Sequence, residues 1–161
     1  MLWLRGAIFT VLVPAVIGVW IPHRMLDGAS PAAGWWASGW LLLGAGTLLY
    51  GWCLMLFLLS GGTPAIFFTR PVSFLIGKEP PSVVRQGPYR YSRNPMYVAV
   101  VAVILGQAAV YQSGGVFEYA VIVFFMFHLV VVLLEEPHLR EERGADYELY
   151  CRSVARWLGR K

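Results

Sequence analysis

Residues whose types and spacing could do chemistry gather between Gly87 and Tyr97, in the segment GPYRYSRNPMY. Tyrosines are interleaved there with the cations Arg90 and Arg93, and the side-chain amide of Asn94 follows. Pro95 suits the first position of a helix, where its missing N–H removes no hydrogen bond. Free backbone N–H groups at a helix start favour an anion, so the segment predicts a site for an anionic group such as a ligand carboxylate.

A carboxylate pair, Glu135-Glu136, supplies the opposite charge at the end of an uncharged run. The four residues QSGG at 112–115 join this run to the one that begins at Asn94, which predicts an antiparallel helical hairpin. The pair then lies beside the Arg93 segment, and together the two clusters could bind an amino-acid moiety that carries both charges. In the alternative interpretation, the pair is a solvated helix end in which Glu136 contacts Arg140.

Long uncharged runs predict the elements that position these residues. Of the 161 residues, 58% are hydrophobic and 14% are charged, whereas about 25% are charged in a soluble domain. A membrane span needs about 20 apolar residues. We therefore predict a single domain, 1–161, of an all-α integral membrane protein with about four transmembrane helices. The expected spans are about 3–21, 35–59, 95–112 and 116–134, with a cleavable signal peptide as the alternative for the first.

Two further segments flank the expected site. Segment 60–94 is too rich in Gly and Pro for a continuous helix and too apolar for a solvated loop, so we expect it to lie against the membrane face or to fold back onto the bundle. After Pro137, apolar residues recur at helical spacing. They predict a C-terminal amphipathic helix, 138–160, at the membrane surface.

The distribution of positive charge predicts the orientation in the membrane. Of the 13 Lys and Arg residues, only Arg24 lies in a loop on one side, and the other twelve lie on the side of both termini and segment 60–94. Cationic loops stay in the cytoplasm, so we expect both termini and the active site there, in an inner or plasma membrane protein. The net charge of +4 fits this topology and contact with anionic membrane lipids. We expect no nucleic-acid partner and no metal, and Cys53 and Cys151 form no disulfide framework.

These motifs resemble the isoprenylcysteine carboxyl methyltransferase and phospholipid methyltransferase superfamily, in its bacterial form. Gly87 to Tyr97 is similar to its Gly-x-Tyr-Arg-x-x-Arg-[His/Asn]-Pro-x-Tyr segment, which enters a helical hairpin. The Glu-Glu pair follows, and Gly144 to Tyr150 is similar to its Gly-x-x-Tyr-x-x-Tyr tail. The resemblance covers residues 60–160 and implies an S-adenosyl-L-methionine-dependent methyltransferase.

The resemblance also implies roles for individual residues. Arg93, Asn94 and Glu135 would act in catalysis, with Glu135 holding the ammonium group of the cofactor. Asn94 stands where many members have His. The implied cofactor-binding residues are Pro81, Ser82, Val83, Val84, Gly87, Tyr89, Arg90, Asn94, Pro95, Met96, Tyr97, Glu135 and Glu136.

The expected acceptor is a lipophilic small molecule that enters from the bilayer and is methylated on an amine, thiol, hydroxyl or carboxyl group. Val131 replaces the Arg with which prenylcysteine enzymes hold a substrate carboxylate, which argues against that substrate. We expect Val131, Gln107 and His128 to contact the acceptor; His128 could be a base or a packed, hydrogen-bonded side chain. The alternatives are a non-catalytic membrane subunit and a sterol-reductase-like NADPH oxidoreductase, for which the chain is small.

Overall fold

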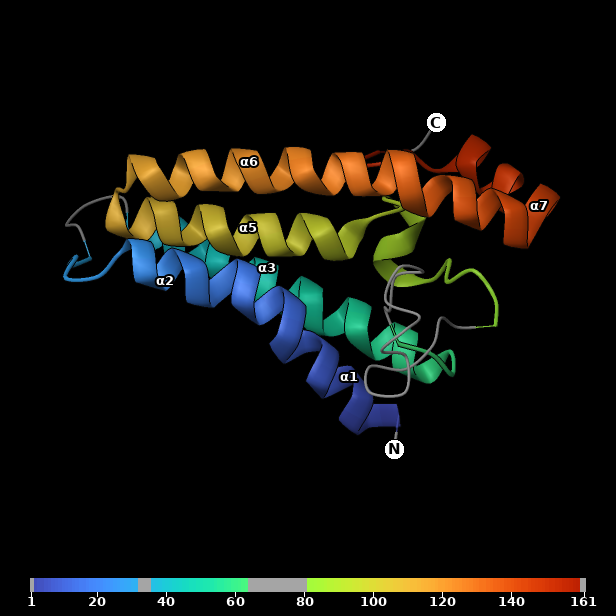
Figure 1. Cartoon of the computed structure of the whole chain (residues 1–161), viewed down its shortest axis with the longest axis horizontal. Coiled ribbons are helices and arrows are strands. Elements are labelled where there is room, and N and C mark those ends of the chain that lie inside the picture. The colour runs from blue at the N-terminus through green and yellow to red at the C-terminus, as the bar shows by residue number, and fades with distance from the viewer. Residues whose placement is uncertain (1, 32–35, 64–80, 160–161) are drawn as a thin grey trace.

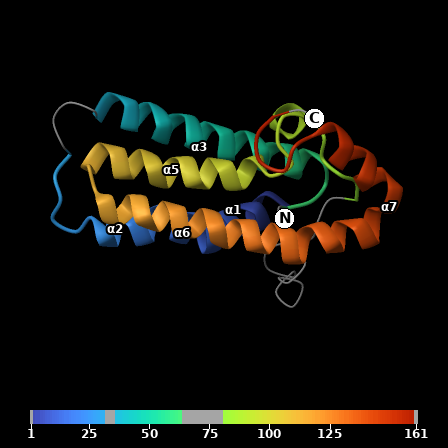
Figure 2. The same cartoon turned by 90° about the horizontal axis from the view of Figure 1, so that it is seen from above.

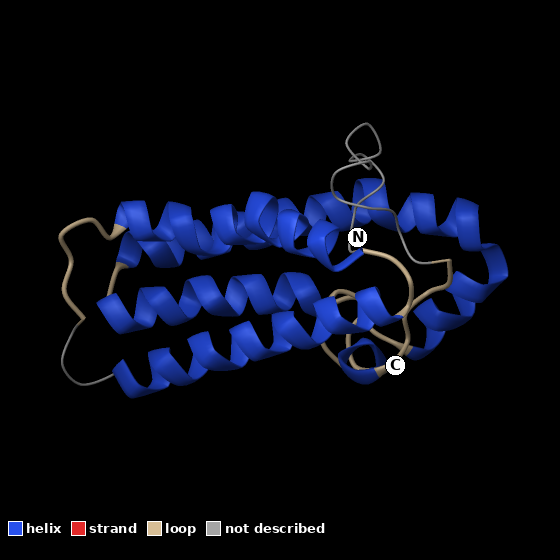
Figure 3. Cartoon of the chain, turned by 90° about the horizontal axis from the view of Figure 1, so that it is seen from below, coloured by secondary structure: helices blue, strands red, loops and turns tan. Residues whose placement is uncertain are grey.

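The computed structural model describes residues 2–31, 36–63 and 81–159, and these residues fold mainly into long helices without a strand (Figures 1 and 3). Two of the long helices change type along their length. In chain order the elements are α1 (Leu2–Thr10), the π-helical η1 (Val11–Trp20), α2 (Ile21–Met25), α3 (Trp36–Leu59), the 3-10 helix η3 (Gly87–Arg90), α5 (Pro95–Tyr111), α6 (Gly114–Val130), the π-helical η4 (Val131–Glu135) and α7 (Glu136–Ser153).

Within the described residues, three helices are long and apolar enough to cross a membrane: Trp3–Met25, Ala37–Leu59 and the one that begins at Gly114. The helix α5 has 17 residues. Its length of about 26 Å is at the lower limit for a span. The chain is an all-α integral membrane protein, as the uncharged runs predict. Helices α3 and α5 have nearly the bounds of the expected helices 35–59 and 95–112, whereas the first helix continues to Met25, beyond residue 21.

Glycines bring α3 and α5 into direct backbone contact. A Cβ atom built on Gly106 would lie 2.7 Å from the backbone nitrogen of Leu43, and one on Gly39 would lie 2.7 Å from that of Val110. A Cβ on Gly46 would lie 2.9 Å from the carbonyl oxygen of Ala99. No side chain larger than hydrogen fits at these points. The pair is therefore packed as closely as small residues allow between membrane helices.

The N-terminal helix is attached to the bundle differently, through side chains. The amide of Gln107 on α5 donates to the carbonyl of Gly18 at 2.6 Å, and the hydroxyl of Tyr119 on α6 donates to that of Ile17 at 3.1 Å. Both carbonyls lie four or five residues before Pro22, which has no N–H to offer them. Inside a membrane such carbonyls need another donor. Gln107 and Tyr119 supply it.

The last helix does not follow the predicted boundaries. We expected a span that ends near residue 134 and a separate amphipathic helix over 138–160, but the structure has one helix from α6 through η4 into α7. Pro137 lies at the start of α7, directly after the π-helical turn, and does not interrupt it. Gly144 bends α7 with φ 50° and ψ −129°, values that suit glycine alone. Beyond Ser153 the chain is not helical, and its end returns to the segment before α5 (Figure 2).

Candidate functional site

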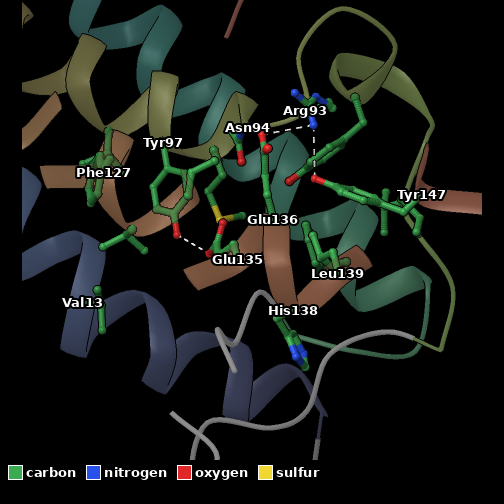
Figure 4. A pocket seen from close by; sticks show the side chains of 18 of the residues that line it. Val13, Arg93, Asn94, Tyr97, Phe127, Glu135, Glu136, His138, Leu139 and Tyr147 are labelled. Carbon is green, nitrogen blue, oxygen red and sulfur yellow. Dashed lines mark hydrogen bonds and ion pairs between the residues drawn. The ribbon is translucent and has the colours of Figure 1, made fainter. Parts of the chain in front are cut away.

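A cavity of about 420 Å³ lies where the hairpin, the N-terminal helix and the segment before α5 meet. This volume is in the range of ligand sites, roughly 300–1,000 Å³. Figure 4 shows Val13 and Phe127 on one side of it and Arg93 and Tyr147 on the other. The residues that line it are Phe9, Val13, Pro14, Ile17, Phe57, Ser82, Val83, Val84, Tyr89, Arg93, Asn94, Met96, Tyr97, Val100, Met126, Phe127, Val130, Val131, Glu135, Glu136, His138, Leu139, Arg143, Tyr147 and Tyr150.

The cavity has a polar part and an apolar part. The polar side chains come from the segment 82–97 and from 135–150, just outside the apolar stretches of the helices. Most of the apolar side chains come from η1, the first turns of α5 and the last turns of α6 with η4, and the others are Phe9, Phe57, Val83, Val84 and Leu139. A ligand with one polar and one apolar portion therefore finds matching surfaces in one continuous space.

Glu135 lies at the boundary between the two parts. Its carboxylate accepts a hydrogen bond from the hydroxyl of Tyr97 at 2.5 Å (Figure 4). The ring of Tyr97 packs on Phe127, with the ring centroids 4.5 Å apart. The hairpin therefore brings the first turn of α5 and the end of η4 together, as the sequence predicts.

Glu136 is enclosed by arginines. Arg156 binds it through Nε at 2.6 Å and Nη2 at 3.1 Å, Arg140 through Nη2 at 3.0 Å and Arg93 through Nη1 at 3.1 Å. Burial by itself raises the pKa of this carboxyl group, but the hydrogen bond from Arg156 and the charges of Arg93, Arg156 and Arg140 outweigh burial, and the pKa is lowered. Glu136 is an ionised counter-ion that joins three segments, not the solvated helix end of the alternative interpretation, although its contact with Arg140 was expected.

Arg93 fills a position between the helices instead of projecting into solvent. Its side chain is 5% exposed, and Nη1 also contacts the sulfur of Cys151 at 2.7 Å and the hydroxyl of Tyr147 at 3.4 Å. Its Nε atom is buried without a hydrogen-bond partner among the described residues. Arg93 is therefore a buried cation, and it lines the polar part of the cavity.

The C-terminal segment 154–159 lies along the segment before α5. The backbone N–H of Arg93 donates to the carbonyl of Ala155 at 3.0 Å, and that of Gly159 donates to the carbonyl of Tyr91 at 2.9 Å. Nδ2 of Asn94 donates to the carbonyl of Arg156 at 3.0 Å. Residues more than sixty positions apart in sequence therefore build one wall.

Tyrosines close the cavity on the side of α7. The hydroxyl of Tyr150 donates to the carbonyl of Tyr89 at 2.6 Å, which fixes the short helix η3 against α7. Tyr89 is 5% exposed, and burial raises its pKa well above the usual value, so the phenol stays neutral. Its ring meets Phe57 edge to face, with the centroids 5.6 Å apart.

Several predicted site residues lie away from the cavity: Pro81, Gly87, Arg90, Pro95, Gln107 and His128. Gln107 binds the backbone of the N-terminal helix. Nδ1 of His128 accepts a hydrogen bond from Nε1 of Trp157 at 3.1 Å, and the two rings stack. His128 is therefore the packed, hydrogen-bonded side chain of the two interpretations, and its Nδ1 is not free to act as a base.

Other lining residues carry no recognisable motif and were not predicted. The N-terminal helix contributes Val13, Pro14 and Ile17, and α7 contributes His138 and Arg143, which donates to the carbonyl of Pro81. One signal was present, a lining residue at every fourth position: Phe127, Val131, Glu135, Leu139, Arg143 and Tyr147. On a regular α-helix, which has 3.6 residues per turn, residues four apart are offset in angle, so a long series of them would not stay on one face. The wider π-helical turn η4 and the bend at Gly144 keep it on one side.

Fold and site together define a class: a helical membrane protein whose hairpin, charged mouth and C-terminal segment enclose a cavity that is polar at one end and apolar at the other. The family model for phospholipid methyltransferases matches residues 39–145, most of the chain, and the protein belongs to this family of membrane methyltransferases. No curated protein and no solved structure matches the chain.

Proposed function

We propose that the protein transfers a methyl group from S-adenosyl-L-methionine to a lipophilic small molecule at this cavity. The observation that carries the proposal is the change from a polar to an apolar lining within one space, with Glu135 at the boundary. A polar cofactor and an apolar acceptor can then meet without either leaving its preferred surroundings.

The polar part fits an amino-acid moiety. Glu135, at the boundary of the two parts, offers a carboxylate for an ammonium group. The guanidinium group of Arg93, which lines the cavity, supplies positive charge for a carboxylate. Tyr89, Tyr147 and Tyr150 give aromatic surface for a nucleoside. When bound, the cofactor supplies an activated methyl group on a sulfonium centre.

The protein's own residues align the reactants and keep water out. Val84 and Tyr89 are buried and close the cavity toward α3, and Phe127 and Val131 close it toward the bundle core. Holding two reactants in the right geometry is worth up to about 7–11 kcal/mol of the barrier, so no covalent intermediate with the protein is needed. Arg93, Asn94 and Glu135 hold the polar reactant from three sides.

The acceptor is proposed to enter sideways from the bilayer. Figure 1 shows α1 leaning away from α5 and α6, and the apolar lining lies between this helix and α6. Val13, Ile17 and Val130 suit an alkyl or isoprenoid chain, at about 0.8 kcal/mol per buried methylene. Val131 offers no charge to a carboxylate, which favours a neutral amine, thiol or hydroxyl group on the acceptor.

The proposed orientation has both termini and the polar part of the cavity in the cytoplasm, where the cofactor is made available. It rests on the concentration of Lys and Arg on that side of the sequence. Anionic lipid headgroups would contact the same side.

Ligand titration on detergent-purified protein tests the proposed function. S-adenosylhomocysteine should bind saturably, and NADPH should not. Incubation with cofactor labelled on the methyl group and a panel of lipids should then transfer label to a lipid. Binding of NADPH alone would favour the reductase alternative, and binding of neither would favour a non-catalytic subunit.

A further inference from the structure

The orientation of the Asn94 side chain is determined from outside the cavity. Its Nδ2 donates to the main-chain carbonyl of Arg156 at 3.0 Å. A carbonyl oxygen can only accept, so the amide nitrogen must face it and Oδ1 must face away from it. Asn94 lines the cavity beside Arg93 and Tyr97 (Figure 4). The group presented to a ligand is therefore a hydrogen-bond acceptor.

The position of Asn94 in the chain makes this arrangement unusual. Asn94 is the N-cap residue of α5, where an Asn oxygen normally accepts a hydrogen bond from the backbone of the helix's first turn. Here the side chain makes no such bond. The oxygen that would cap the helix is left for the cavity.

The carbonyl of Arg156 is held in place by the side chain of the same residue. The guanidinium group binds both oxygens of Glu136, at 2.6 and 3.1 Å, and this carboxylate is 2% exposed. A two-point ion pair fixes direction as well as distance. Trp157 anchors the next position through His128. The C-terminal segment therefore cannot rotate its carbonyl away from Asn94 while these contacts persist.

We propose that Arg156 is a positioning residue of the cofactor site and acts through Asn94, by keeping the amide oxygen turned toward an N–H or O–H group of the bound cofactor. The inference rests on the proposed function. It concerns the C-terminal segment 154–159, which lies outside the range 39–145 that the family model matches. A His at position 94 could make the same two contacts, since one ring nitrogen can donate to the carbonyl while the other accepts in the cavity.

The test is a double-variant cycle read by calorimetric titration of S-adenosylhomocysteine into the purified full chain. Asn94→Leu and Arg156→Gln should each weaken binding about tenfold, the worth of one hydrogen bond. The combined variant should also lose about tenfold, because both changes remove the same contact. Asn94→His should bind nearly as well as the unmodified protein. Arg152→Gln changes an exposed arginine near the end of α7, four residues before Arg156, and is the matched control.

The outcomes separate this inference from the proposed function. Losses that multiply to about a hundredfold in the combined variant would show that Arg156 acts independently of Asn94 and would overturn the inference. Unchanged binding in Arg156→Gln, or a loss in Asn94→His as large as in Asn94→Leu, would overturn it too. If Arg156→Gln does not purify as a folded protein, Arg156→Lys replaces it, because Lys keeps the charge but not the two-point contact. Arg156→Lys should lose less affinity than Arg156→Gln. Combined with Asn94→Leu, it should cause no loss of affinity beyond that of Asn94→Leu alone. Absence of binding to the unmodified protein would reject the proposed function itself, and this inference with it.

Discussion

The hydroxyl of Tyr97 and the carboxylate of Glu135, 2.5 Å apart, join the first turn of α5 to the end of η4 at the point where the cavity changes from polar to apolar. Tyr97 is the donor and the carboxylate the acceptor of this hydrogen bond. The pair marks the place where a polar cofactor and an apolar acceptor would be in contact.

We predict that Glu135→Gln weakens binding of S-adenosylhomocysteine by about 1.5–3 kcal/mol, because a charge-assisted hydrogen bond to an ammonium group is lost. Isothermal titration of the purified protein measures this. Glu141→Gln changes an exposed carboxylate of the same helix and should leave affinity unchanged. Affinity in Glu135→Gln equal to that of the unmodified protein would mean that this carboxylate does not hold the cofactor.

Glu136→Gln should lower stability more than Glu135→Gln does. Removal of one partner from a buried ion pair typically destabilises a protein by about 3–5 kcal/mol, and here Arg93 would remain buried without its counter-ion. Thermal unfolding in detergent measures the loss. Glu148→Gln, which removes an exposed partner of Arg140, is the control and should have little effect.

The same ion pairs predict a direction of pH dependence. The pKa of Glu136 is lowered in the folded protein, so its contribution to stability is fully present above the pKa of an unfolded Glu. That contribution is lost as the pH falls through the lowered value. The unfolding temperature of the unmodified protein should therefore fall toward that of Glu136→Gln in acid. A constant difference between them across the acid range would contradict this.

Cysteine labelling of intact cells tests the orientation. In a background without Cys53 and Cys151, a cysteine at Ala29 should react with a membrane-impermeant reagent, and one at Glu141 should react only after the membrane is opened. Both positions are exposed in the structure. The opposite result would place the polar part of the cavity outside the cell, away from the cofactor.

Acceptors of rising chain length should show a falling KM, since each added methylene is buried against the apolar lining. A series of alkylamines, alkanethiols and alkanols with labelled cofactor measures this. Val131→Arg should improve turnover of the matching carboxylated compounds, because Val131 is 1% exposed in the lining and an Arg there adds a cation. Equal KM values for short and long acceptors would argue against entry from the bilayer.

The sequence predicts the long apolar helices because a bilayer requires helices without charged residues, and composition reveals these directly. It also brings Tyr97 beside Glu135, since a four-residue connection leaves the hairpin a single arrangement. The prediction of helix ends is wrong where a local motif is ambiguous. Pro137 predicts a break in the helix, but the π-helical turn before it lets the helix continue to the bend at Gly144.

The polar residues inside the spans have partners that the sequence does not reveal. Gln107 and His128 are candidates for substrate contact because intramembrane polar groups are often functional. Their partners, the carbonyl of Gly18 and the indole of Trp157, are remote in sequence, so only the three-dimensional structure identifies them. In the sequence, only Pro22 indicates that the carbonyl of Gly18 needs another donor, because Pro22 has no N–H to offer.

The different attachment of α3 and of the N-terminal helix has a kinetic consequence. Glycine contacts lock α3 to α5 backbone to backbone, whereas η1 is held by two side-chain hydrogen bonds and by packing. Of these two helices, the N-terminal one is therefore the more easily displaced. In the proposed reaction a methylated lipid that leaves sideways would have to displace it, so the residence time of that product would depend on Gln107 and Tyr119. Amide hydrogen exchange should accordingly be faster in residues 11–22 than in 39–51.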